Sequence, residues 1–133
     1  QQKKLLLRKK LQQKKLLLRK KLQQKNNYLF QVISISTTSN SKEVLKNISK
    51  ELLKQKLSPC THIIKISKSS YIWEGEIIQK KEYMLEVKTI KEKEMLVIDC
   101  IKKNHNYKTF EISKKKIESL NQDYNEWFEK QIL

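Results

Sequence analysis

Two long extended runs separated by a single glycine constrain this chain more than any other sequence feature. The first run covers His62–Tyr71 and the second covers Ile77–Ile90, and Gly75 is the only glycine among the 133 residues. Glycine adopts positive φ without a Cβ penalty, so this position marks either a bend or bulge within a long hairpin or the hairpin turn itself. Tyr71 and Trp73 stand two positions apart and share one strand face, which favours burial of both rings at a strand-to-strand interface. If Gly75 is only the turn, Trp73 is a single core residue.

The remaining elements predict an α+β domain. Alternation and helical spacing indicate a strand over 28–36, a turn over 37–40, a helix between Ser41 and Pro59, a helix over 91–104, a strand over 107–112 and a helix over 121–133. In the second of these helices, Met95, Ile98 and Ile101 form the predicted buried side. The order β-α-β-β-α-β is that of the ferredoxin-like fold, an antiparallel sheet with two helices on one face, here with an extra C-terminal helix.

The first 25 residues differ from the rest in composition. Residues 1–11 read QQKKLLLRKKL, residues 12–22 repeat them letter for letter, and residues 1–25 hold eleven Lys or Arg and no acid out of a net charge of +16. Every residue type in the repeat favours helix. A basic helix could bind acidic membranes or nucleic acid. A low-complexity extension without a function of its own would have the same sequence. We therefore divide the chain into an extension, 1–27, and a domain, 28–133.

Composition also limits location and activity. We find no secretory signal and no apolar run long enough to cross a membrane, which favours the cytoplasm, although the extension leaves organelle targeting open. Two cysteines and two histidines make neither a disulfide framework nor a nucleophile triad in a familiar context, and one glycine cannot build a phosphate loop. We expect a binding or assembly protein and no enzyme.

Few side chains are candidate metal ligands. Cys60 and His62 share a strand face and make a two-ligand arm, whereas closed metal sites use four ligands. Cys100 is expected to be a small buried hydrophobe. His105 lies between a helix and a strand, where it suits either a metal or structural hydrogen bonds. Acids of the hairpin, at 74, 76, 82 and 86, could hold hard cations or remain solvated.

Several motifs together resemble the CutA family of divalent-cation tolerance proteins over residues 28–133. The matching segments are Ser36-Thr37-Thr38-Ser39, then Leu53, Lys56, Leu57 and Cys60, the hairpin segment Ser69–Ile77, Lys88-Thr89, then His105, Tyr107 and Glu111, and finally Tyr124 and Trp127. No single motif is specific, but the series is.

The resemblance implies a compact homotrimer in which the hairpins pair between subunits, with Tyr71 and Trp73 at the trimer interface. It also implies a cleft between subunits, formed by Lys88, Tyr107, Glu111, Tyr124 and Trp127. The family is associated with copper and other divalent cations, and copper has been attributed to a cysteine at the end of the first strand and a His-His pair. This chain has Ser36 and Asn104-His105 at those places, so His105 is the one metal ligand predicted from the resemblance.

Three functions follow as hypotheses. The first is a homotrimer, without catalytic activity, involved in divalent metal ion (copper) binding or tolerance. The second is a nucleic-acid- or membrane-binding protein that acts through residues 1–25. The third is a trimeric sensor that binds a small ligand at its subunit clefts.

Overall fold

The computed structural model describes residues 1–25 and 31–133 of the chain. It consists of two compact units, residues 1–31 and residues 32–133. The predicted boundary after residue 27 falls among residues 26–30, outside the described part, and stays a prediction. None of the helices in the described ranges is both long and apolar enough to cross a membrane.

The first unit contains the helix α1 (Gln2–Lys25), as the helix-favouring repeat indicates. Its leucines at positions 5, 6, 7, 11, 16, 17 and 18 are each more than half exposed. These seven leucines are therefore not packed within the helix's own unit, and the helix depends on intrinsic propensity over a long run.

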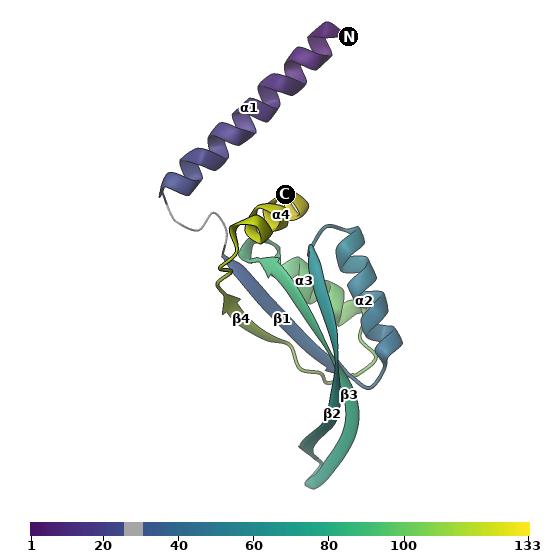
Figure 1. Cartoon of the computed structure of the whole chain (residues 1–133). Coiled ribbons are helices and arrows are strands. Elements are labelled where there is room, and N and C mark those ends of the chain that lie inside the picture. Colours follow the sequence, from purple (N-terminus) through teal and green to yellow (C-terminus); the bar gives the residue numbers. More distant parts are fainter. Residues whose placement is uncertain (26–30) are drawn as a thin grey trace. The chain divides into compact units, whose positions relative to one another are not determined.

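The second unit is a four-stranded antiparallel sheet with helices, and it confirms the predicted ferredoxin-like α+β fold (Figure 1). Its elements are β1 (Val32–Ser39), α2 (Lys42–Lys54), β2 (Cys60–Trp73), β3 (Glu76–Ile90), the 3-10 turn η1 (Lys91–Lys93), α3 (Glu94–Asn104), β4 (Ser113–Ile117) and α4 (Gln122–Ile132). The strand order is β2-β3-β1-β4, which leaves β2 and β4 at the sheet edges.

The hydrophobic core lies between one face of the sheet and the helices α2 and α3. Ile33 and Ile35 of β1 and Leu85 and Val87 of β3 pack in one cluster with apolar side chains of the two helices, chiefly Leu45, Ile48, Leu52, Val97 and Ile101. Because side chains alternate along a strand, the residues between these positions lie on the opposite face. We call that face the open face; Ser34, Ser36, Met84 and Glu86 belong to it.

The β2–β3 hairpin has the predicted length, but Gly75 has a different role from a bend or bulge. Glu74 and Gly75 both have positive φ, 50° and 79°, and join Trp73 to Glu76 as a two-residue turn. The irregularity in pairing lies elsewhere, between Ile66 and Ser69. The turn interpretation is therefore correct for the glycine, although Trp73 is 51% exposed in the single chain and is no core residue.

The last strand lies later than predicted. Residues 107–112 are not a strand, and β4 is Ser113–Ile117, paired with β1 from Ser36↔Ser113 to Val32↔Ile117. The apolar residues in 107–112 have another cause, since Tyr107 and Phe110 contact the His105 ring, and Phe110 and Ile112 pack against the edge of the core cluster. The sequence SKKKI of β4 has no alternating apolar pattern, because an edge strand needs little apolar surface, and the strand is therefore not predicted from the sequence.

Two further expectations are corrected. Thr37, Thr38 and Ser39, expected in a turn, continue β1, and Ser41 alone caps α2 by accepting a hydrogen bond from the Val44 amide. Met95 is 62% exposed, while Val97 and Ile101 are buried. The cause is helical spacing: at 3.6 residues per turn, Met95 lies nearly opposite Val97 on α3, so the face that buries Val97 and Ile101 turns Met95 outward.

Candidate functional site

A cleft of about 930 Å³ lies between the hairpin and the segment that follows α3. It is lined by both aromatic residues predicted at subunit contacts, Tyr71 and Trp73, and by two residues of the predicted intersubunit cleft, Tyr107 and Glu111. One chain thus brings together two residue sets that the sequence analysis assigned to different places.

Tyr107 is the centre of the polar network in this cleft. Its hydroxyl donates to Glu82 Oε2 at 2.8 Å and accepts from the Asn40 amide at 2.8 Å. Burial, followed by the hydrogen bond to Glu82, raises the pKa of Tyr107 to about 12. Since Glu82 is only 6% exposed, this hydroxyl serves as a donor to a buried carboxyl group.

Lys80 supplies a positive charge between two rings of the cleft. Its Nζ lies 6.0 Å from the centre of the Tyr71 ring and 5.9 Å from that of Tyr107. Both distances are within the range of cation–π attraction. Lys80 is not among the site residues predicted from the sequence. The Glu74-Gly75 turn is the signal that could have found it, because the turn fixes the register that pairs Lys80 with Ser69.

His105 has hydrogen bonds at both ring nitrogens. Nδ1 accepts from the Tyr107 amide at 3.0 Å, so the neutral ring carries its proton on Nε2, which donates to the Thr38 carbonyl at 3.0 Å. The ring also stacks on Phe110, with centres 4.2 Å apart. Burial lowers the pKa of His105, against the raising effect of the Thr38 bond and of Glu82.

The residues at the family's copper positions do not converge on one point. Ser36 belongs to the open face, His105 turns to Thr38, and the Asn104 amide donates back to the Cys100 carbonyl at 2.8 Å. Among the described residues, no group of three or more His, Cys, Asp or Glu side chains could hold a metal ion. This donor set does not fit copper as arranged, and a metal ligand role for His105 stays a prediction that requires one of its hydrogen bonds to break.

The other predicted cleft residues form a second group at the far end of β3. Lys88 Nζ lies 5.5 Å from the centre of the Tyr124 ring, and Tyr124 lies 5.5 Å from Trp127. Burial, followed by Cys60 and Glu86, raises the pKa of Tyr124 to about 12. Lys88 and Lys80 are separated by about 26 Å along an extended strand, so one chain does not join Lys88, Tyr124 and Trp127 to the cleft at Tyr107.

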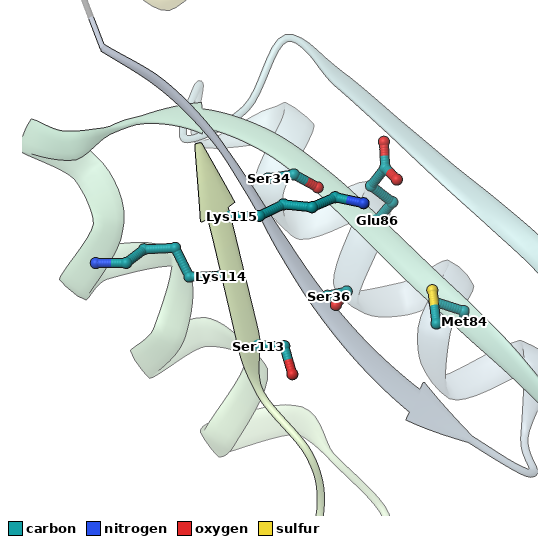
Figure 2. Close-up of a pocket in the computed structure, with 7 residues that line it drawn as sticks. All are labelled: Ser34, Ser36, Met84, Glu86, Ser113, Lys114 and Lys115. Atoms are coloured by element: carbon teal, nitrogen blue, oxygen red, sulfur yellow. The ribbon is translucent and has the colours of Figure 1, made fainter. Parts of the chain in front are cut away.

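The open face has a shallow hollow of about 240 Å³ between β1, β3 and β4 (Figure 2). Lys115 extends across it above Ser34 toward Glu86, while Lys114 points to the opposite side, where it pairs with Glu94 at 2.5 Å. Ser34 is 2% exposed, and its hydroxyl has no hydrogen-bond partner among the described residues. The open face is therefore polar and only partly covered.

Comparison with known proteins gives the class and then the family. A solved structure from Archaeoglobus fulgidus, described as a periplasmic divalent cation tolerance protein CutA, is 34% identical, with a TM-score of 0.71 over 77% of this chain and 99% of that one. CutA1 from Oryza sativa is 27% identical, with a TM-score of 0.72 over 77% and 94% of the two chains. The second unit thus has the ferredoxin-like fold of these proteins.

The sequence comparisons agree. The family described as CutA1 divalent ion tolerance protein matches residues 33–131. The divalent-cation tolerance protein CutA of Thermotoga maritima is 33% identical over 102 residues, which make up 77% of this chain and 99% of that protein. This chain belongs to the CutA family of divalent-cation tolerance proteins.

Proposed function

We propose that this protein is a homotrimer that takes part in tolerance of divalent metal ions, copper or another divalent cation, without catalysing a reaction. The hairpin is the observation that carries the proposal. Near its turn, Ile72 is 75% exposed, Ile77 is 77% exposed and Trp73 is 51% exposed in the single chain. Three large apolar side chains at one hairpin end are a surface that another chain would cover.

The backbone of the hairpin supports the same conclusion. β2 is a sheet edge of 14 residues. A long edge strand presents unpaired N–H and C=O groups, and natural proteins cover or shorten such edges. Pairing of β2 with a neighbouring subunit satisfies those groups and covers Ile72 and Trp73 in one step.

The metal part of the proposal rests on family membership and on the donors available. Because no three-ligand group lies within the described part of one chain, a closed site would need ligands from more than one subunit, or water. The trimer and the metal are therefore linked in this proposal. The predicted ligand His105 joins such a site only if it gives up its bond to Thr38 or to Tyr107.

Two measurements test the proposal. Sedimentation at micromolar concentration should report three chains per particle, and native mass spectrometry with added Cu²⁺ and Zn²⁺ should report the metal count per trimer. A monomer in sedimentation contradicts the assembly. A trimer that binds neither ion contradicts the metal function while leaving the assembly intact.

A second candidate, the small-ligand sensor, is favoured by the 930 Å³ cleft, whose lining includes aromatic rings and both a positive and a negative side chain, Lys80 and Glu82. This size is that of small-molecule sites. Native mass spectrometry of the trimer purified without denaturation should then show a bound mass that Tyr107→Ala removes. A trimer that carries no extra mass argues against the sensor.

For location, the sequence favours the cytoplasm, and we retain it as the proposed compartment. The Archaeoglobus fulgidus relative is described as periplasmic, so the compartment needs its own measurement. Fractionation of cells into periplasmic and cytoplasmic extracts, followed by immunodetection, decides it.

A further inference from the structure

The open face places a thiol, an imidazole and a carboxylate in one row. Cys60 and His62 of β2 stand two positions apart, and the cross-strand partner of His62 is Glu86 of β3. Cys60 Sγ lies 3.9 Å from His62 Nε2, and His62 Nδ1 lies 3.8 Å from Glu86 Oε1. The two ring nitrogens of His62 therefore face two different chemical groups.

The first distance suits joint binding of one metal ion. Zinc lies about 2.3 Å from a cysteine sulfur and about 2.0–2.1 Å from a histidine nitrogen, so tetrahedral geometry puts the two donor atoms about 3.6 Å apart. The observed 3.9 Å is close to that value. A small side-chain rotation brings both donors to bonding distance of a single ion, with no backbone change.

Glu86 lies where the supporting carboxylate of a metal-binding histidine would lie, although its 3.8 Å distance from Nδ1 is longer than a hydrogen bond. A ligating imidazole typically gives its other N–H to a carboxylate, which fixes the tautomer and the ring orientation. Glu86 faces Nδ1, which leaves Nε2 for the metal on the side of Cys60. In the single chain the Glu86 side chain is 21% exposed and that of His62 is 53% exposed, so the pair lies outside the core of its own domain.

Two lysines lie near this row of side chains, and one of them, Lys115, extends from β4 toward Glu86. Lys88 is the cross-strand partner of Cys60, but its Nζ lies over the Tyr124 ring. Cys60 is a free, partly exposed thiol.

We infer that Cys60 Sγ and His62 Nε2 chelate a thiophilic divalent cation of the Zn²⁺ class, with Glu86 as the positioning residue for His62. Binding forms one metal–sulfur and one metal–nitrogen bond and releases the thiol proton to water, and water completes the coordination. No electron is transferred. This inference rests on the proposed function, because it assigns to the same protein a metal site at positions other than Ser36, Asn104 and His105.

The chain offers a matched test, since it has two cysteines and two histidines. Zn²⁺ is titrated by calorimetry into the reduced full-length protein, and Cd²⁺ is titrated while the ultraviolet charge-transfer band of a cadmium–thiolate bond is recorded. We expect one ion per chain and a cadmium–thiolate band for the natural sequence. Cys60→Ser should remove the band, and Cys60→Ser and His62→Thr should each weaken Zn²⁺ binding on the order of 100-fold or more.

Glu86→Gln should weaken Zn²⁺ binding by about 10-fold or more while leaving the band, as expected of a residue behind the ligand. Cys100→Ser is the control and should leave both readouts unchanged, and His105→Gln tests whether the family position binds the ion instead. Far-ultraviolet circular dichroism verifies that each variant is folded, and a variant at either of these two positions that does not fold is replaced by Cys100→Ala or His105→Asn.

The outcomes separate this inference from the proposed function. No cadmium–thiolate band in the natural sequence, or Zn²⁺ binding that survives His62→Thr, overturns the chelating pair. Loss in His105→Gln together with retention in His62→Thr also overturns it and returns the metal to the family position. A monomer with Cys60-dependent binding contradicts the trimer but supports the site.

Discussion

At the scale of single residues, Tyr107 connects three parts of the domain. Its hydroxyl bonds to the end of β1 through the Asn40 amide and to β3 through Glu82, while its own amide holds Nδ1 of His105. These contacts replace the strand hydrogen bonds that the sequence analysis expected over 107–112. They also explain why an irregular segment keeps a defined position beside the cleft.

Tyr107→Phe removes the donor to a carboxyl group that is nearly buried. We expect a loss of about 1–3 kcal/mol in the free energy of unfolding, the usual cost of leaving a buried polar group unsatisfied. Urea unfolding measures it. Tyr71→Phe, in the same cleft, is the matched control and should change little; equal losses in both variants would contradict the role given to Glu82 and Tyr107.

The raised pKa values of Tyr107 and Tyr124, both about 12 against an ordinary value of 10, predict alkaline sensitivity. In the folded state the neutral phenols persist to higher pH than in the unfolded chain. Their contribution to stability is therefore complete below about pH 10 and is lost as pH rises from 10 to 12. Unfolding at a series of pH values measures this loss, and the double variant Tyr107→Phe, Tyr124→Phe should show a flatter decline; an unchanged slope would refute it.

At the scale of elements, the sequence predicts what depends on local pattern. The β2–β3 hairpin, α2 and α4 follow from alternation, helical spacing and capping residues such as Ser41 and Asn121. β4 does not follow, because its pairing to β1 is a tertiary contact and three of its residues are lysines. The bulge between Ile66 and Ser69 has no glycine to mark it.

In the candidate sites, too, some contacts follow from local sequence pattern and others depend on tertiary structure. Face sharing along one strand predicts the Cys60–His62 pair, since it needs only a period of two. The place of Glu86 opposite His62 requires the register of the whole hairpin, including the bulge. The hydrogen bonds of His105 to Thr38 and Tyr107 depend on the path of an irregular segment, which no periodicity encodes.

Trp73→Ala tests the hairpin as an assembly element. Trp73 is half exposed in one chain, so a large effect requires a neighbouring chain that covers the ring. We expect the free energy of unfolding to fall by about 3–5 kcal/mol, on the scale of aromatic truncations in cores. The melting temperature should fall as well, and sedimentation should show weaker association of the trimer.

The control is Leu120→Ala, at a position 91% exposed, which should stay within about 0.5 kcal/mol of the natural sequence. If Trp73→Ala leaves both the trimer and its melting temperature unchanged, the interface assigned to the hairpin is wrong.

At the scale of the whole molecule, the two units predict separable behaviour. Removal of residues 1–25 should leave the melting temperature of the remaining protein unchanged, because the second unit has its own core. The melting midpoint of both forms should rise with protein concentration if unfolding is coupled to dissociation. Calorimetric scans over a range of concentrations measure both effects, and a midpoint independent of concentration would contradict the obligate trimer.

The same truncation decides the role of the basic helix. Binding of single-stranded RNA by the full chain, if it depends on α1, should weaken steeply with salt and disappear on removal of residues 1–25. Fluorescence anisotropy at several salt concentrations measures this dependence. Equal RNA binding by the two forms would show that α1 is not the element that binds nucleic acid.

The letter-for-letter repeat in α1 makes the length and the charge of that helix multiples of one eleven-residue unit. Each copy of eleven residues adds about 16 Å of helix length and turns the next copy by only about 20°, because eleven residues make just over three turns. Each copy also carries five basic residues and no acid. Insertion or deletion of one copy would therefore change length and charge together by a constant increment while keeping the same side chains nearly in line.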